Sequence, residues 1–430
     1  MNFAKTTELF RRSAFGSVGV PAIIRCKAFT REDIIAELSY LKIPGSPLRR
    51  TRMISAWIPR FAVRRIVELP QVEMVYLDAI ARIPEIKHGF ELFNFQLRRS
   101  LGFGDWTPDM LFEQMDGWIS TMESRDALEA NLAESAGITG RGVKIGIVDT
   151  EASERYAQHP QLQSAVVARA NFTPSPTDEN GHGGHCSTIA AGRRAVSIPN
   201  KIEVKGVAPS ASIIAAKCLA TPMGVGQTSW IVNAMDWAIE QGADIISMSL
   251  GGPIQSPDPQ VDFIAEHRGE AIFVAAAGNE GPGSATLSSP GHSPDVISVG
   301  SLSLIDGQVS SFSSRGPAPD GTIKPDVIAP GGGRETSGSV PDENIYSGIT
   351  FGTLLDREAD KIGNGYTAIA GTSMSTPHIS GFLALLLEAG LLGNDPMKYT
   401  DVFKSIMMAQ RAKTNSMGWG MPKWSMYAKG

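Results

Sequence analysis

The chain has 430 residues, of which 42% are hydrophobic and 19% charged, and its formal net charge is −5. This balance predicts an ordinary water-soluble folded protein and excludes a disordered chain. With 45 Gly and 27 Pro, the chain has too many helix-breaking residues for a helical bundle or a coiled coil.

The N-terminal residues 1–15 include Lys5, Arg11 and Arg12 but no apolar run, so they do not form a secretory signal. Three cysteines allow at most one disulfide, which is typical of a reducing compartment. We therefore expect a cytoplasmic protein, or a secreted one if a signal was removed. The longest apolar stretch, residues 379–393, is too short for a bilayer, and we expect no membrane contact. The cysteines are Cys26, Cys186 and Cys218.

Charge is unevenly distributed along the chain. Residues 1–65 contain 13 Lys and Arg against 4 Asp and Glu, whereas residues 136–430 contain 21 against 27. The basic segment lacks the aromatic residues and motifs of a nucleic-acid-binding surface, so we expect no nucleic-acid partner. A basic segment can instead dock on an acidic part of the same chain.

The pattern at residues 29–83 is typical of a small α+β unit. It predicts a strand at Met53–Ile58, an amphipathic helix at Arg60–Leu69 and a returning pair of strands at Gln71–Ile83. We therefore divide the chain into three parts. They are an α+β domain at 1–85, a connecting extension at 86–130 and a larger domain at 131–430.

From residue 141 onward, short apolar runs alternate with helical stretches. The runs lie at 143–149, 211–219, 243–250, 271–278 and 296–302. Continuous apolar runs are typical of strands that are buried on both faces of a parallel sheet. A helix is predicted at 229–241, with Gly242 in position to end it. The pattern predicts an α/β fold with a doubly wound, mostly parallel sheet.

Three short segments carry chemically active residues in the order Asp, His, Ser. They are Val148–Thr150 at a strand end, the NGHGGH segment at 180–185 and the GTSMSTPH segment at 371–378. With Ala277–Asn279 and Gly418–Gly420, these segments make the chain similar to the subtilisin-like serine peptidases (subtilases) from about residue 137 to 420. The resemblance implies the subtilisin fold and cleavage of peptide bonds.

The resemblance assigns four catalytic residues, and their chemistry fits. A serine hydroxyl such as that of Ser373 needs a base to take its proton, and His182 can supply one. Asp149 would hold the imidazole in one tautomer. The Asn279 amide and the Ser373 backbone N–H would stabilise the oxyanion. Each residue also has a plain structural explanation, since Ser and Asp cap helices and strands and Asn favours turns.

Other residues near these motifs receive structural or secondary roles. His185 and His378 are interpreted as packing residues, because the family uses the first His of HGxH. Cys186 stands where the proteinase K-like branch has a free thiol, and we interpret it as a small buried hydrophobe that is sensitive to mercurials. The family usually has Gly soon after the aspartate, whereas here Glu151 follows Thr150, which can alter the pKa environment of the triad.

We predict that no cofactor is required. Subtilases often bind calcium in a loop after the histidine helix, but residues 193–200 contain two Arg and no carboxylate. A calcium site is therefore not expected there, although weaker sites elsewhere stay open. No Cys/His cluster has zinc spacing.

The resemblance also implies a peptide-binding cleft. One wall is expected to pair with an extended peptide, and small residues on the other wall leave room for a large apolar or aromatic side chain. We expect the insertion at 332–365 to narrow specificity. The residues of the first wall are Ser249, Leu250 and Gly251, and those of the second are Ala276, Ala277 and Gly278.

The front domain at 1–85 resembles the inhibitory propeptide of subtilases. The interpretation is a serine endopeptidase that acts on polypeptides and is made as a self-inhibited precursor. Three alternatives remain open: a peptide ligase or cyclase on the same scaffold, an inactive peptide-binding homologue, and an accessory role for the front domain.

Overall fold

The computed structural model describes residues 20–28, 30–49, 51–83, 117–197, 201–220, 222–333, 343–358 and 365–428. Within these ranges no helix has the length and apolar character needed to cross a membrane.

A parallel sheet organises the larger unit. Its seven described strands follow the order β16-β15-β14-β13-β7-β11-β8. They are β7 (Lys144–Asp149), β8 (Val166–Asn171), β11 (Ser212–Lys217), β13 (Ile245–Met248), β14 (Ile272–Ala276), β15 (Ile297–Leu302) and β16 (Val327–Pro330). Neighbouring strands pair in parallel throughout. This confirms the predicted doubly wound α/β fold.

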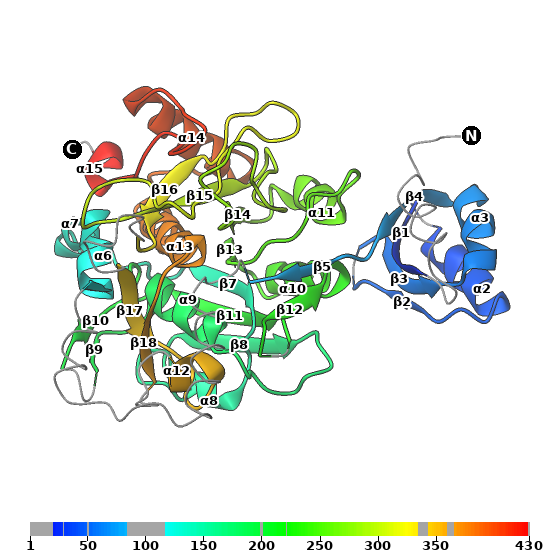
Figure 1. Cartoon of the computed structure of the whole chain (residues 1–430), viewed down its shortest axis with the longest axis horizontal. Helices are drawn as coiled ribbons and strands as arrows, with labels where there is room; N and C mark the ends of the chain where they lie inside the picture. Colours follow the sequence, from blue (N-terminus) through cyan, green and yellow to red (C-terminus); the bar gives the residue numbers. More distant parts are fainter. Residues whose placement is uncertain are drawn as a thin grey trace, which may run out of the picture.

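Helices cover both faces of this sheet (Figure 1). Strand β11 shows why: Ile213 and Ala215 enter the core under α9 (His182–Ala191) and α13 (Thr372–Glu388). Their neighbours Ile214 and Ala216 enter a second core under α10 (Thr228–Glu240) and α11 (Pro259–His267). Since successive strand residues point to opposite faces, a continuous apolar run is buried on both sides.

Smaller elements surround the sheet. Strands β17 (Asn344–Gly348), β18 (Tyr366–Ile369) and β6 (Trp118–Ser120) form a second, three-stranded sheet. Residues 118–120, which the prediction placed in the connecting extension, thus pair with the larger unit, while residues 86–116 lie outside the described residues. The other elements are β9 (Ala195–Val196), β10 (Glu203–Val204), β12 (Val225–Gln227), α6 (Thr121–Ala127), α7 (Ala130–Ser135), α8 (Glu154–Ala157), α12 (Leu354–Glu358), η2 (Pro396–Lys398), α14 (Tyr399–Gln410) and α15 (Trp424–Tyr427).

The N-terminal unit, called the front unit below, has its own antiparallel sheet, in the order β2-β3-β1-β4. Its elements are β1 (Val20–Cys26), α2 (Arg31–Tyr40), β2 (Gly45–Pro47), β3 (Met53–Ile58), α3 (Arg60–Glu68) and β4 (Val72–Leu77). The strand and helix expected from residue 53 onward are present, and β1 extends the unit further toward the N-terminus than the pattern indicated. A separate apolar core fills the space between its sheet and helices.

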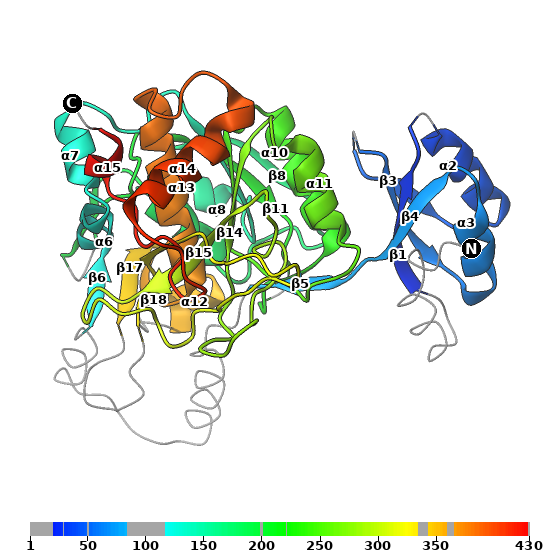
Figure 2. The ribbon, with the colours of Figure 1, turned by 90° about the horizontal axis from the view of Figure 1, so that it is seen from above.

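The two units meet at α10 and α11 (Figures 1 and 2). Arg25 of β1 donates to Asp262 of α11 at 2.9 Å and also pairs with Glu266. The Asp78 carboxylate accepts hydrogen bonds from the backbone N–H of Ser229 at 2.9 Å and from its hydroxyl at 2.7 Å. Because Ser229 lies in the first turn of α10, the front unit supplies a carboxylate to the N-terminus of a helix in the larger unit.

Candidate active site

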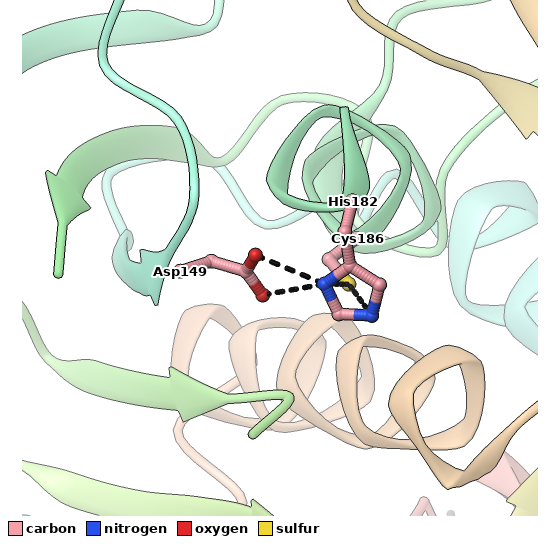
Figure 3. Close-up of side chains that lie close together, drawn as sticks. All are labelled: Asp149, His182 and Cys186. Atoms are coloured by element: carbon pink, nitrogen blue, oxygen red, sulfur yellow. Dashed lines mark hydrogen bonds and ion pairs between the residues drawn. The ribbon is translucent and has the colours of Figure 1, made fainter. Parts of the chain in front are cut away.

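Asp149 and His182 form a buried carboxylate–imidazole pair. Strand β7 ends at Asp149 and helix α9 begins at His182, so the carboxyl end of the strand and the start of the helix bring the two side chains together (Figure 3). His182 Nδ1 lies 2.9 and 3.0 Å from the two carboxylate oxygens. A carboxylate only accepts, so Nδ1 carries the proton and Nε2 is left as the base.

The environment of His182 favours its charged form. Burial alone would lower the pKa of the imidazole, but the Asp149 carboxylate raises this pKa well above its ordinary value. An imidazolium formed during proton transfer is therefore stabilised in place. This is the electrostatic arrangement that a general base needs when it must hold a proton and then release it.

The turn before His182 sets the direction of the ring. Asp178 accepts from the backbone N–H of Asn180 at 2.8 Å and of Gly181 at 3.0 Å. The Asn180 side chain in turn accepts from the His182 N–H at 3.0 Å. Gly181 has φ of 97°, and a Cβ there would lie 2.3 Å from Thr353 Oγ1, so glycine is required on both counts.

Ser373 is the second residue of α13 and is fully buried. Its hydroxyl donates to the Ser249 carbonyl oxygen at 3.2 Å, and among the described residues it makes no hydrogen bond to His182. The Cys186 thiol joins the two, because its Sγ lies 3.8 and 3.9 Å from the His182 ring nitrogens and donates to the Ser373 carbonyl oxygen at 3.5 Å. The Ser373 carbonyl group and the His182 imidazole therefore both contact the Cys186 thiol.

Asn279 is held with its amide toward Ser373. Its Oδ1 accepts from the Thr372 N–H at 3.0 Å and from the Thr372 hydroxyl at 2.8 Å. A Cβ placed on Gly371 would lie 3.2 Å from Asn279 Nδ2 and 3.7 Å from the Ser373 nitrogen. The two donors therefore border the same small space, which suits an oxyanion.

His185 and His378 make structural hydrogen bonds. His185 Nε2 contacts the carbonyl oxygens of Ile345 and Thr367 at 3.1 and 3.3 Å. His378 bridges the Met374 carbonyl oxygen and the Ser124 hydroxyl, each at 2.7 Å. Burial lowers the pKa of His185 to about 3 and that of His378 to about 4, so both rings stay neutral.

A segment of the front unit lies along the expected peptide-binding wall. Strand β5 (Ile80–Arg82) pairs antiparallel with β12 on one side. On the other side, Arg82 exchanges two 2.9 Å backbone hydrogen bonds with Gly251. The sequence analysis did not identify the β12 wall; Gly224 and Gly226, just before the predicted helix, are the signal that could have revealed it.

The other predicted wall residues contribute backbone rather than side chains. Leu250, Ala276 and Ala277 have no exposed side-chain surface, and Ser249 donates from its hydroxyl to the Ser373 carbonyl oxygen at 2.8 Å. Ser288 connects the walls. Its N–H donates to the Ala277 carbonyl oxygen at 3.0 Å, and its Oγ would lie 2.4 Å from a Cβ on Gly251.

Gly278 stands beside a carboxylate that the sequence analysis did not single out. A Cβ on Gly278 would lie 2.7 Å from both Glu280 Oε2 and Ser314 Oγ. The same Glu280 oxygen accepts from the Asn279 N–H at 2.9 Å. Glu280 therefore helps to fix the backbone of Asn279.

Metal binding is a second chemical possibility for the buried cluster of Figure 3. The donor atoms of Asp149, His182 and Cys186 lie within 4.8 Å of one another. The Nδ1 proton of His182 already points at Asp149, however, and burial raises the pKa of the Cys186 thiol and keeps it protonated. We therefore interpret the cluster as a hydrogen-bonded carboxylate–imidazole pair with a neighbouring thiol.

Comparison with known proteins agrees with this geometry. Residues 140–420 match the model of the subtilase family. Serine protease AprX of Bacillus subtilis (strain 168) is 36% identical over 275 residues, which are 58% of this chain and 58% of AprX. The major intracellular serine protease of the same organism is 35% identical over 261 residues, 58% of this chain and 70% of that protein.

Subtilisin E of Bacillus subtilis (strain 168) is 37% identical over 268 residues, 61% of this chain and 59% of subtilisin E. The matches to AprX and subtilisin E thus span less than two thirds of those relatives. The family model, by contrast, covers more than half of the present chain and includes all the segments that form the buried site. The chain therefore belongs to the subtilase family.

Proposed function

We propose that this protein is a serine endopeptidase with Ser373 as nucleophile, His182 as general base and Asp149 as the carboxylate that orients the imidazole. The observation that carries the proposal is the buried Asp149–His182 pair, joined at 2.9 Å beside the start of helix α13. The membership of the chain in the subtilase family supports the same chemistry.

The proposed reaction follows from these positions. The Ser373 hydroxyl turns from Ser249 toward His182 Nε2, gives up its proton and attacks the carbonyl carbon of the substrate. Asp149 stabilises the imidazolium that forms, and the Asn279 amide with the Ser373 N–H binds the oxyanion. His182 then protonates the leaving amine, and water hydrolyses the acyl-enzyme by the same steps.

Peptide substrates would enter as an added strand. Strand β12 and Gly251 both offer backbone groups to an extended chain, and β5 already uses them. Because main-chain hydrogen bonds read no side chains, recognition at these positions is broad, and the segment at Ala276–Gly278 is left to select the residue before the cleaved bond.

The rate should depend on pH through His182. A protonated imidazole cannot accept the serine proton, so kcat/KM should fall about tenfold per pH unit below the His182 pKa in the free enzyme. Because Asp149 raises this pKa, the acid limb should lie above the ordinary histidine value. A kcat/KM profile with a chromogenic peptide measures it, and a limb centred below pH 6 would contradict the assigned environment.

We also infer that the front unit inhibits the larger one. Strand β5 fills the cleft between β12 and Gly251, and the Ile83 N–H donates to the Gly224 carbonyl oxygen at 3.0 Å. A peptide substrate needs the same backbone groups, so the two compete. The opposite charges of the front unit and of α10 and α11 favour the docked arrangement.

Replacing Asp78 with Ala should weaken this inhibition. The change removes both acceptors of Ser229 at the start of α10, a loss of about 1 kcal/mol, or roughly fivefold in docking equilibrium. Freshly purified full-length protein, checked by intact mass for processing, should show correspondingly higher activity. Asp33→Asn, an exposed carboxyl of α2, is the matched control, and equal activity of all three proteins would refute self-inhibition through this contact.

We further propose that Arg193 supplies the positive charge that calcium supplies in the corresponding loop of other subtilases. Its guanidinium donates to the carbonyl oxygens of Pro209 at 2.6 Å and of Ser164 and Ala211 at 2.9 Å. A fixed cation of the chain thus satisfies several carbonyl groups that lie together behind α9.

Two measurements follow for thermal unfolding. A chelator should leave the Tm unchanged, whereas Arg193→Gln should lower the free energy of unfolding by about 3 kcal/mol, since the partly buried Pro209 and Ala211 carbonyl contacts and the exposed Ser164 contact lose a charged donor. Arg194→Gln, at a neighbouring and mostly exposed side chain, should have little effect. A fall in Tm with chelator alone would show that a bound metal ion is needed after all.

A further inference from the structure

The loop after the catalytic aspartate contains a second acid, Glu151, which faces another buried acid, Asp178. Glu151 is 2% exposed and Asp178 is 3% exposed. Glu151 lies two residues beyond the end of β7, and Asp178 lies four residues before His182. The pair therefore occupies the space between the two segments that supply the carboxylate and the imidazole of the site.

Asp178 is a hub for the backbone around His182. Its carboxylate accepts from the N–H groups of Asn180 and Gly181 and, at 3.1 Å, from the Thr150 hydroxyl. The Thr150 oxygen in turn accepts from the Gly183 N–H at 3.0 Å. One carboxyl group thus ties the residue after Asp149 to both sides of the turn that aims the imidazole.

Glu151 lacks a donor for one of its oxygens. Its Oε1 accepts from the Ser153 N–H, whereas Oε2 is buried and, among the described residues, receives no N–H or O–H hydrogen bond. The Asp178 carboxyl lies beside Glu151, because it accepts from the hydroxyl of Thr150, the residue before Glu151, and the Glu151 carboxyl acts on it through a side-chain hydrogen bond and through its charge. Two carboxyls form a hydrogen bond with each other only when one of them carries a proton.

The charges around the pair do not replace that proton. The Lys217 ammonium donates to the carbonyl oxygens of Thr150 at 2.8 Å and of Leu219 at 2.6 Å rather than to either acid. Asp149 adds a further negative charge at the end of β7, just before this loop, and the Tyr156 hydroxyl is hydrogen-bonded to Ser187 at 2.7 Å. In the described part of the chain, the other titratable groups near this loop include His182 and Cys186 of α9. They also include Glu154, Arg155 and Arg169, which line a cavity outside it.

We propose that Glu151 and Asp178 share one proton, and that this proton is a positioning device for the catalytic imidazole. The proposal rests on the assignment of His182 as general base. With the proton in place, the two acids attract and hold the Thr150 and Gly181 backbone together. Without it, two like charges repel inside the turn and displace His182 from the substrate.

Because the native state retains this proton, its stability depends on pH. Burial, followed by the charge of Glu151, raises the pKa of Asp178 well above its ordinary value. Between the ordinary Asp pKa, about 4, and this raised value, the native protein holds a proton that the unfolded chain has released. The stability of the native state therefore falls as pH rises through this window, by up to tenfold in the unfolding equilibrium per pH unit.

The test uses the full-length chain with Ser373→Ala, so that neither hydrolysis nor processing intervenes. Glu151→Gln supplies an amide donor to Asp178 and keeps the net charge of the pair at −1. The ratio of the unfolding equilibrium constant of the parent to that of this variant should rise at least tenfold between pH 5 and pH 8, because the parent loses stability over this range. The same ratio for the control Glu154→Gln, at an exposed residue, should not change with pH. A pH-independent difference for Glu151→Gln would overturn the proposal.

Two further measurements test the proposal if a variant fails to fold or if the pair has only a structural role. An infrared carbonyl band of a protonated carboxyl should be present in the parent at neutral pH and lost in Glu151→Gln or in Asp178→Asn; its absence from the parent would overturn the shared proton. In protein that retains Ser373, loss of the shared proton at high pH should displace His182 and lower kcat/KM. In Glu151→Gln this fall in kcat/KM should occur at higher pH than in the parent. A fall at the same pH in both proteins would overturn the positioning role but not the shared proton. Failure of the peptidase proposal is distinguishable, since it would appear as hydrolysis that survives Ser373→Ala.

Discussion

Replacement of Ser373 with Ala is expected to abolish peptide hydrolysis, with a loss in kcat on the order of a million-fold. The variant keeps the Asp149–His182 pair and the Asn279 amide but has no oxygen to attack the carbonyl carbon. His182→Ala should be about as severe, and the double variant no worse, because the two residues act as one unit. Single-turnover and steady-state rates with a chromogenic peptide measure the loss.

Ser375 offers a matched control on the same helix. It is buried two residues further along α13, and its hydroxyl makes no hydrogen bond among the described residues. Ser375→Ala should therefore retain activity close to that of the parent protein. Residual hydrolysis within tenfold of the parent in Ser373→Ala, confirmed free of contaminating protease, would contradict the triad.

Asn279→Ala is expected to lower kcat by roughly a hundred- to a thousand-fold with little change in KM. The reason is that the proposed role of the Asn279 amide is to meet negative charge that develops only in the transition state. Hydrogen bonds from Thr372 hold the Asn279 side chain in place in the resting protein. The variant also leaves the Thr372 N–H without its acceptor, so part of the effect could come through α13.

Asn279→Asp separates the two contributions. Aspartate keeps an oxygen for Thr372 but has no amide donor, so kcat should fall at least as far as in the alanine variant while the Tm stays near that of the parent. A change confined to KM in both variants would remove Asn279 from the oxyanion site.

The sequence predicted the architecture where local pattern and tertiary environment agree. Five central strands are apolar on both faces, and each was found in its predicted run. Strand β8 was not predicted, because it lies at the sheet edge and its residues alternate between partly buried and exposed. The sequence there therefore has no continuous apolar run. Strand β16 is a short run that ends in Pro330, and a proline within a run argues against a central strand.

The candidate site was predictable as a set of residues but not as a geometry. Short motifs around Asp149, His182 and Ser373 identify the chemistry, because each type is needed in the same reaction. The bond from the Ser373 hydroxyl to Ser249 and the contact of Glu151 with Asp178 depend on segments that lie far apart in the chain. Only the fold brings such segments together, so no local pattern contains them.

The claim that Ser373 is the activated nucleophile is tested most directly with a fluorophosphonate probe. The serine oxygen displaces fluoride from phosphorus, and the adduct is located by intact mass and peptide mapping. One adduct is expected, on the peptide that contains Ser373; it should be absent from Ser373→Ala and strongly reduced in His182→Ala. Equal labelling of Ser373→Ala and the parent, or an adduct on another residue, would contradict this claim.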